Sequence, residues 1–170
     1  MKFPDDALAS TLLVLLLSVP LSSAADELKV RVTSYIASHD IKPVAGVEGR
    51  VAGSYLRRGM VFNENGEVGV FRSTGNLTMT KGRGIVESES VYTYEDGSTL
   101  ALKVDGEVEA RPGGGLIYRK LTGNVLGGTG RYEGIVGTGT ATGRNLTPFT
   151  EETRSDAYFD VVVTYQVPRR

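Results

Sequence analysis

The sequence predicts an all-β fold, a single antiparallel eight-stranded β-barrel. After residue 26, apolar and polar residues alternate with a period of two, which is typical of half-buried strands. Turn signals separate the alternating runs at short intervals, so neighbouring strands are expected to be antiparallel, because parallel neighbours need crossovers of about a dozen residues. Eight strands with one apolar face each can form a sandwich or close into a barrel; closure removes both exposed edges, and the glycines described below favour it.

The first 25 residues have the layout of a secretory signal peptide. Residues 7–19 are almost wholly apolar but too few to span a bilayer as a helix, which takes about 20 residues. Pro20 follows, and then a run of small residues that ends at Ala25. We therefore expect cleavage before Asp26, a β-barrel domain over residues 26–170, and a secreted or periplasmic protein. An uncleaved membrane anchor is the alternative.

The strands follow one another along the chain with their apolar residues on one face. The clearest run is Leu100–Val108, in which Leu100, Leu102 and Val104 face one way and charged residues face the other. The first and last runs repeat the pattern, with apolar residues at every second position from Leu28 and from Ala157. The expected strands are 28–36, 50–62, 67–79, 84–94, 99–110, 116–125, 131–142 and 156–167. Turn signals between them are NENG, KGRG, EDGS, RPGGG and LGGTG.

Eight glycines fall between Gly123 and Gly143, and they raise the question of a phosphate-binding loop. A Walker loop needs a Gly-Lys pair that opens a helix, and no such pair occurs here. GTGRYEG has one residue too many for the dinucleotide fingerprint, and the threonines that follow favour a strand. The glycines are therefore interpreted as parts of a strongly curved barrel strand, where they permit bends or close backbone approach.

The charge balance and the absence of cysteine exclude several classes of partner and site. The chain has 19 basic and 20 acidic side chains, and without Lys2, Asp5 and Asp6 the two numbers are equal. No positive excess exists to attract a phosphate backbone, so nucleic acid is not expected as a partner. Cysteine is absent, so there is no disulfide, no thiolate nucleophile and no Cys metal site, and the fold relies on its core alone. We expect no cofactor and no metal.

Few residues suggest chemistry. His39 is the only histidine and is interpreted as an exposed loop residue after the first strand. Glu87 and Glu89 share one face of their strand, and the opposite face carries Ser88, Ser90, Tyr92 and Tyr94. If the tyrosine face points inward, hydroxyl groups line the lumen and the two glutamates are solvated. With the reverse parity, two carboxylates with raised pKa enter the lumen. Unpaired buried carboxylates are costly, which favours the first arrangement.

The arginines are interpreted as rim or outer-face residues, namely Arg57, Arg58, Arg72, Arg119 and Arg131.

YTYEDGSTLAL (Tyr92–Leu102), LGGTGRYEGIVGTGTATG (Leu126–Gly143) and DAYFDVVVTY (Asp156–Tyr165) resemble segments of the allene oxide cyclase barrel-like family. The resemblance covers about residues 85–165. The more distant dirigent proteins share the barrel and a Gly-Gly-Thr-Gly turn, and SHDI (Ser38–Ile41) is similar to the end of their first strand. The resemblance implies an eight-stranded barrel with an apolar cavity. In allene oxide cyclases a Glu and an Asn on the first strand assist cyclisation, and Val30–Asp40 contains neither.

Two functions are compatible with these observations. The first is a binding barrel that holds an apolar or aromatic small molecule, without a clear catalytic constellation and with homo-oligomerisation through its outer surface as a further expectation. The second is a cyclase, isomerase or dirigent-like enzyme that steers cyclisation of a bound lipid or phenolic substrate, with Asp40 as the acid that the dirigent resemblance implies. The candidate catalytic residues are Asp40 and Tyr35, and the candidate ligand-binding residues are Ser34, Ser90, Tyr92, Tyr94 and Arg119.

Overall fold

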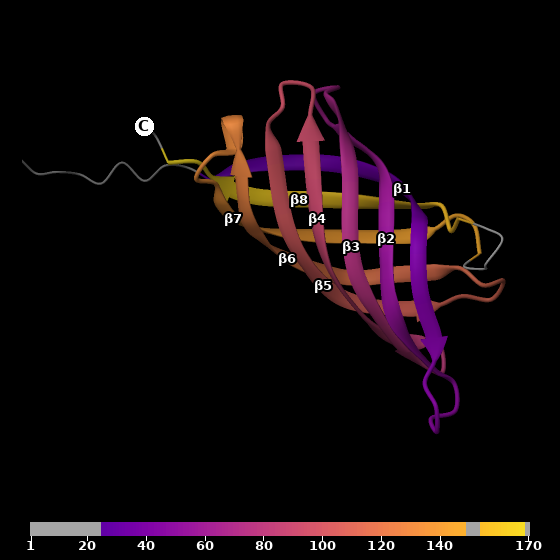
Figure 1. Cartoon of the computed structure of the whole chain (residues 1–170). Coiled ribbons are helices and arrows are strands. Elements are labelled where there is room, and N and C mark those ends of the chain that lie inside the picture. The colour runs from indigo at the N-terminus through magenta and orange to yellow at the C-terminus, as the bar shows by residue number, and fades with distance from the viewer. Residues whose placement is uncertain (1–24, 149–153, 169–170) are drawn as a thin grey trace, which may run out of the picture.

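The computed structural model describes residues 25–148 and 154–168, and these form a closed antiparallel barrel of eight strands (Figure 1). Each strand pairs with the next along the chain, and β8 returns to pair with β1. The predicted fold class is confirmed. The strands are β1 (Asp26–Pro43), β2 (Arg50–Asn63), β3 (Val68–Thr80), β4 (Arg83–Tyr94), β5 (Thr99–Ala110), β6 (Leu116–Thr129), β7 (Val136–Asn145) and β8 (Ala157–Gln166).

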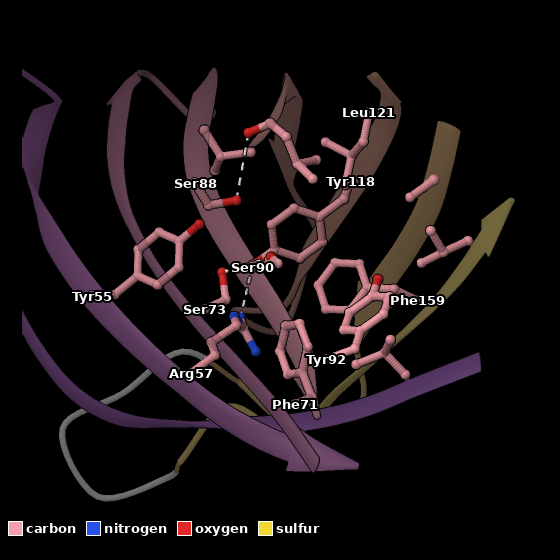
Figure 2. Close-up of a pocket in the computed structure, with 15 residues that line it drawn as sticks. Tyr55, Arg57, Phe71, Ser73, Ser88, Ser90, Tyr92, Tyr118, Leu121 and Phe159 are labelled. Atoms are coloured by element: carbon pink, nitrogen blue, oxygen red, sulfur yellow. Dashed lines mark hydrogen bonds between the residues drawn. The ribbon is translucent and has the colours of Figure 1, made fainter. Parts of the chain in front are cut away.

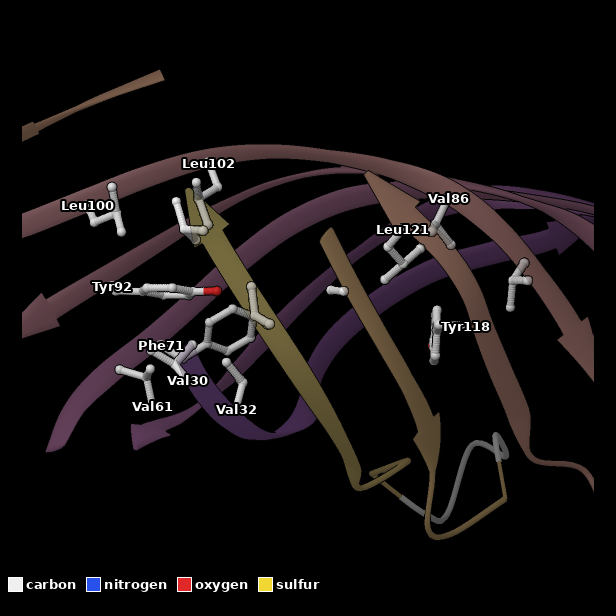
Figure 3. Packing of buried hydrophobic residues seen from close by; sticks show 14 of the residues in the cluster. Val30, Val32, Val61, Phe71, Val86, Tyr92, Leu100, Leu102, Tyr118 and Leu121 are labelled. Atoms are coloured by element: carbon white, nitrogen blue, oxygen red, sulfur yellow. The ribbon is translucent and has the colours of Figure 1, made fainter. Parts of the chain in front are cut away.

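The inward face of each strand carries the apolar set that the alternation predicts. In β4, Val86, Ser90 and Tyr92 are buried, whereas Glu87 and Glu89 are exposed. The tyrosine face of β4 therefore points into the barrel, as the favoured parity predicts. Leu100, Leu102 and Val163 are almost fully buried, and the core is this ring of inward side chains (Figure 3).

Three boundaries differ from the predicted ones by four residues or more. β1 runs to Pro43, so His39 is exposed but belongs to a strand and not to a loop. β6 continues to Thr129, and β7 begins only at Val136. Between them lies the 3-10 turn η1 (Gly130–Tyr132), in which Gly130 has a φ of 61°. The Gly-rich run thus supplies a tight connection between β6 and β7 instead of an uninterrupted strand.

One end of the barrel is closed by aromatic rings and a charged residue. The Arg131 guanidinium lies 4.5 Å from the ring centroid of Tyr94 and 5.0 Å from that of Tyr132. It also forms ion pairs with Glu67 at 2.6 Å and with Asp96 at 3.3 Å. These contacts join the β2–β3, β4–β5 and β6–β7 connections, so the LGGTGRY motif closes this end of the barrel.

Within the described residues, no helix is long and apolar enough to cross a membrane. In the same residues no group of three or more His, Asp or Glu side chains is arranged to hold a metal ion.

Candidate ligand site in the barrel lumen

A small cavity lies in the lumen, with about 50 Å³ of room for the centre of a water-sized molecule (Figure 2). The wall from β2, β3 and β4 carries polar groups, and those used below are Tyr55, Arg57, Ser73, Ser88, Ser90 and Tyr92. The wall from β7 and β8 is apolar and consists of Ala141, Phe159 and Val161. The cavity therefore has one hydroxyl-rich side and one apolar side, as suits a flat or slender organic molecule.

Arg57 carries a positive charge into this cavity. It lies on β2 at the same parity as the buried Val61, so the alternation of the strand turns its side chain inward. Only 3% of the residue is exposed. Its neighbour Arg58 faces outward and is exposed. The prediction that Arg57 is a rim or outer-face residue is therefore wrong, because the parity of β2 separates the two arginines.

The Arg57 guanidinium is held by neutral acceptors. It donates to the Tyr118 hydroxyl at 2.8 Å, to the Ser155 carbonyl at 3.3 Å and to the Ser34 hydroxyl at 3.4 Å. A further hydrogen bond reaches the Asn145 side-chain oxygen at 3.4 Å. Asn145 is thus buried and engaged, although its sequence matches a glycosylation sequon.

Aromatic rings surround the same guanidinium. Its central carbon lies 5.7 Å from the ring centroids of Tyr118 and Phe159 and 5.9 Å from that of Tyr55. Cation–π attraction of this kind offsets part of the cost of burying the charge. Among residues 25–148 and 154–168, no carboxylate forms an ion pair with Arg57, whereas Arg31, Arg119 and Arg131 each have an acidic partner.

The tyrosines of the lumen are neutral hydrogen-bonding groups at physiological pH. Burial raises the pKa of Tyr55 to about 12, and the nearby Tyr118 adds to the shift, whereas Arg57 and Ser88 oppose it. Burial also raises the pKa of Tyr92 above its ordinary value. Both phenols therefore keep their protons and can donate a hydrogen bond to a molecule in the cavity.

The structure brings some of the predicted site residues together in the lumen. Ser90 and Tyr92 line the cavity, and Ser34 is buried and contacts Arg57. Tyr94 is buried too, but it lies at the closed end, where its hydroxyl donates to the Asn63 side-chain oxygen at 3.3 Å. Tyr94 is not among the residues that line the cavity.

The other predicted site residues lie on the outer surface. Asp40 is exposed and forms an ion pair with Lys42 at 2.7 Å. Tyr35 has outward parity, because its neighbours Ser34 and Ile36 are buried, and the Arg154 guanidinium lies 5.5 Å from its ring centroid. Arg119 is exposed and paired with Glu109 at 3.3 Å. Asp40 also borders a second, more open pocket together with Tyr55 and Ser88, and its role as an acid stays a prediction.

Comparisons with known proteins give no family and a distant structural likeness. No family model matches the chain, and no curated protein matches it. Among solved structures, the chain is similar to a pterocarpan synthase dirigent protein, with 12% identity over 88% of this chain and 90% of that one and a TM-score of 0.40. A likeness this distant carries no argument about the site. The resemblance to allene oxide cyclases stays a prediction.

Proposed function

We propose that this barrel binds, in its lumen, an apolar or aromatic small molecule that carries an anionic oxygen, with Arg57 as the counterion. The observation that carries the proposal is the buried Arg57 guanidinium, which borders the cavity and has only neutral partners among the described residues.

Burying an ion without a counterion costs several kcal/mol even after the surroundings relax. The hydrogen bonds and aromatic rings around Arg57 offset part of this cost, but none of them neutralises the charge. An anionic ligand in the cavity would supply the missing charge and form a charge-assisted hydrogen bond, the stronger kind in proteins. The site is thus best suited to carboxylates, phenolates or enolates.

A cyclase, isomerase or dirigent-like activity is the second candidate, and the pairing of Arg57 with Tyr118 favours it. Cationic and neutral donors fixed in a water-poor cavity stabilise negative charge that develops on an oxygen during a reaction. In this version Arg57 and Tyr118 would contact the reacting molecule, and Asp40 would act only on a molecule that reaches the open pocket it shares with Tyr55 and Ser88.

The test compares two ligands that differ in charge. We expect 2-naphthoate to bind the wild-type chain and the neutral 2-naphthamide to bind at least tenfold more weakly, because a hydrogen bond to a charged group contributes about 1.5–3 kcal/mol. In Arg57→Gln the preference for the carboxylate should disappear. Calorimetric titration gives both affinities, and circular dichroism checks that each variant keeps its strands.

Two controls make the result specific. Arg58→Gln removes the same charge from the outer face and should leave both affinities unchanged. Glu151→Gln/Glu152→Gln alters carboxylates outside the described residues and should also have no effect. Two results would overturn the proposal. One is equal binding of the two ligands to the wild type, and the other is tighter naphthoate binding by the double glutamate variant. Either result would show that the charge of Arg57 is satisfied within the protein.

A further inference from the structure

Tyr92 is a buried residue whose hydroxyl borders the cavity and has no hydrogen-bond partner in the described chain. The residue is 2% exposed and lies on β4, with its ring centroid 5.9 Å from that of Phe71. Figure 3 shows its hydroxyl directed toward the middle of the barrel. The hydroxyl borders the cavity, and within residues 25–148 and 154–168 it forms no hydrogen bond. A hydroxyl that borders a cavity and has no protein partner can donate its hydrogen to a ligand or to water in that cavity.

Ser73 and Ser90 leave a second donor beside it. They are 3% and 6% exposed, and the Ser90 hydroxyl donates to that of Ser73 at 3.1 Å. Two hydroxyls contain two hydrogens, and this bond uses one. The Ser73 hydrogen has no acceptor among the described residues. Ser73, Ser90 and Tyr92 are called the hydroxyl wall from here on, and the hydroxyl wall has two donors to spare.

The register of the barrel places the hydroxyl wall next to Arg57. Arg57 pairs with Ser73, and Ser73 pairs with Ser90, so the three residues form one row across β2, β3 and β4. Tyr92 lies one inward position farther along β4, in the row that contains Phe71. Facing residues in neighbouring strands are about 5 Å apart, so one molecule of modest length can contact Arg57 and the hydroxyl wall together.

We infer that the hydroxyl wall is a second subsite, which binds an uncharged oxygen acceptor of the same ligand that Arg57 holds by its anionic oxygen. The inference rests on the proposed function. The ligand class is then an apolar or aromatic acid with a ketone, ester or ether oxygen at a distance from its anionic group. A ketone suits the subsite well, because its two lone pairs can accept from both spare donors.

The alternatives to an uncharged acceptor fit the hydroxyl wall less well. Arg57 is the only buried cation among the described residues, and in the proposed complex it already binds the first anionic oxygen. A second anion at the hydroxyl wall would therefore have no cation of its own. The raised pKa of Tyr92 keeps its phenol protonated, so it offers a hydrogen and no negative charge. Water can occupy the subsite when the cavity is empty, and a ligand oxygen that replaces that water keeps its hydrogen bonds.

The test uses carboxylates that differ only at the far end of a rigid ring system. The probes are 4-acetylbenzoate and 6-acetyl-2-naphthoate, each compared with its isopropyl counterpart, which has the same shape and no acceptor. For each ring length, the measured quantity is the affinity for the acetyl compound divided by the affinity for the isopropyl compound. We expect this ratio to be at least about fivefold lower in Tyr92→Phe than in the wild type, for at least one ring length, because the variant loses one hydrogen bond.

Tyr94→Phe is the matched control, because the Tyr94 hydroxyl is already bonded to Asn63 and lies outside the cavity. It should lower the melting temperature of the ligand-free protein and leave the ratio unchanged. Tyr92→Phe should do the opposite: no loss in melting temperature, and a loss in the ratio. A merely structural role of Tyr92 would make the two variants alike.

The outcomes separate the two proposals. If neither carboxylate binds the wild type, both the proposed function and the second subsite are overturned. If the carboxylates bind through Arg57 but Tyr92→Phe leaves the ratio unchanged at both ring lengths, or lowers the melting temperature as Tyr94→Phe does, the second subsite alone is overturned.

Discussion

At the scale of single residues, the polar groups of the lumen are mostly hydroxyls, and one side chain, Arg57, carries a charge. Arg57 is the charged residue among the buried side chains of the described chain, and the other buried polar groups are serines and asparagines. The buried tyrosines complete this set, because each combines a large apolar ring with one hydroxyl. The barrel is therefore expected to lose stability at alkaline pH, where these hydroxyls would lose their protons.

We expect the free energy of unfolding to fall between pH 10 and pH 12. Burial raises the pKa of Tyr55 to about 12 from an ordinary value of 10.0. In the unfolded chain this phenol loses its proton near pH 10, whereas the folded protein retains it. The contribution is thus fully present below pH 10 and is lost as the pH rises toward 12, by about 1.4 kcal/mol per pH unit. Tyr92 and Tyr94, whose pKa values burial also raises, steepen the loss.

Urea unfolding at pH 9, 10, 11 and 12 measures this slope, and absorbance at 295 nm follows ionisation of the phenols. Tyr55→Phe should be less sensitive to pH over this interval. The same slope in Tyr55→Phe and wild type would contradict the assignment to Tyr55.

Residue patterns in the sequence predict half of the site. Ser90 and Tyr92 were expected in the lumen because β4 alternates cleanly and its other face carries Glu87 and Glu89. The same parity rule applied to β2 places Arg57 on the inward face, because Arg57 and the apolar Val61 are four residues apart. The sequence thus contained a signal that Arg57 points inward. Two adjacent arginines nevertheless look like surface residues, since burying one is costly unless the fold supplies acceptors. Those acceptors come from β6, β7 and the segment before β8.

At the scale of elements, β7 shows where the glycines are needed and where they are not. A Cβ at Gly143 would collide with the Phe159 ring and the Tyr158 carbonyl of β8. A Cβ at Gly139 would lie 3.3 Å from the Val162 carbonyl and 3.6 Å from the Val163 side chain, which neighbouring atoms can accommodate with small shifts. The sequence indicates bends or close backbone approach at these glycines, but the difference between the two follows from the β7–β8 register and Phe159.

Gly143→Ala should therefore destabilise the barrel, by about 1–3 kcal/mol, because overpacking of a closed wall forces its backbone apart. Gly139→Ala should stay within about 1 kcal/mol of wild type, since the loss of chain entropy on folding becomes smaller and offsets a slightly tight contact. Thermal and urea unfolding of the two single variants decide the matter. Equal effects at both positions would show that β7 is not pressed against β8 at Gly143.

The β-bulges are element-scale features that alternation does not reveal. The register of β6 against β7 shifts between Tyr118 and Leu121, and Lys120 adopts a φ of 48° there. Tyr118 and Leu121 are both buried although they are three residues apart. A bulge adds one residue to a strand and so resets its parity, which period-two counting cannot anticipate. Tyr118 consequently points at Arg57 while Leu121 still lines the same cavity.

At the scale of the whole molecule, closure joins the two ends of the described chain. Regular spacing of strands predicts a barrel or a sandwich, and the glycines favour the barrel. The pairing of β1 with β8 over nine residue pairs, from Asp26↔Tyr165 to Ser34↔Ala157, confirms closure. The content of the lumen was not predictable in the same way, because it depends on side chains from all around the barrel that meet only after closure.

Closure also determines how much of the N-terminal region the fold requires. We propose that residues 1–25 are a signal peptide removed on export, and β1 begins at Asp26, the first residue after the expected cleavage point. A chain that starts at Asp26 retains all nine β1–β8 pairs and should melt in one cooperative transition. A chain that starts at Ser34 loses the buried Val30 and Val32 and nearly all of the β1–β8 ladder.

Burying two valines contributes roughly 1.5–3 kcal/mol each, and opening the barrel also exposes an unpaired strand edge, so the shorter chain should show no cooperative transition. Calorimetric scans of the two chains measure this difference, and mass spectrometry of the exported protein shows where it begins. Similar melting of both chains would mean that β1 does not hold the barrel closed. An exported chain that starts at Met1 would contradict cleavage but not the barrel, whose β1–β8 pairing begins at Asp26.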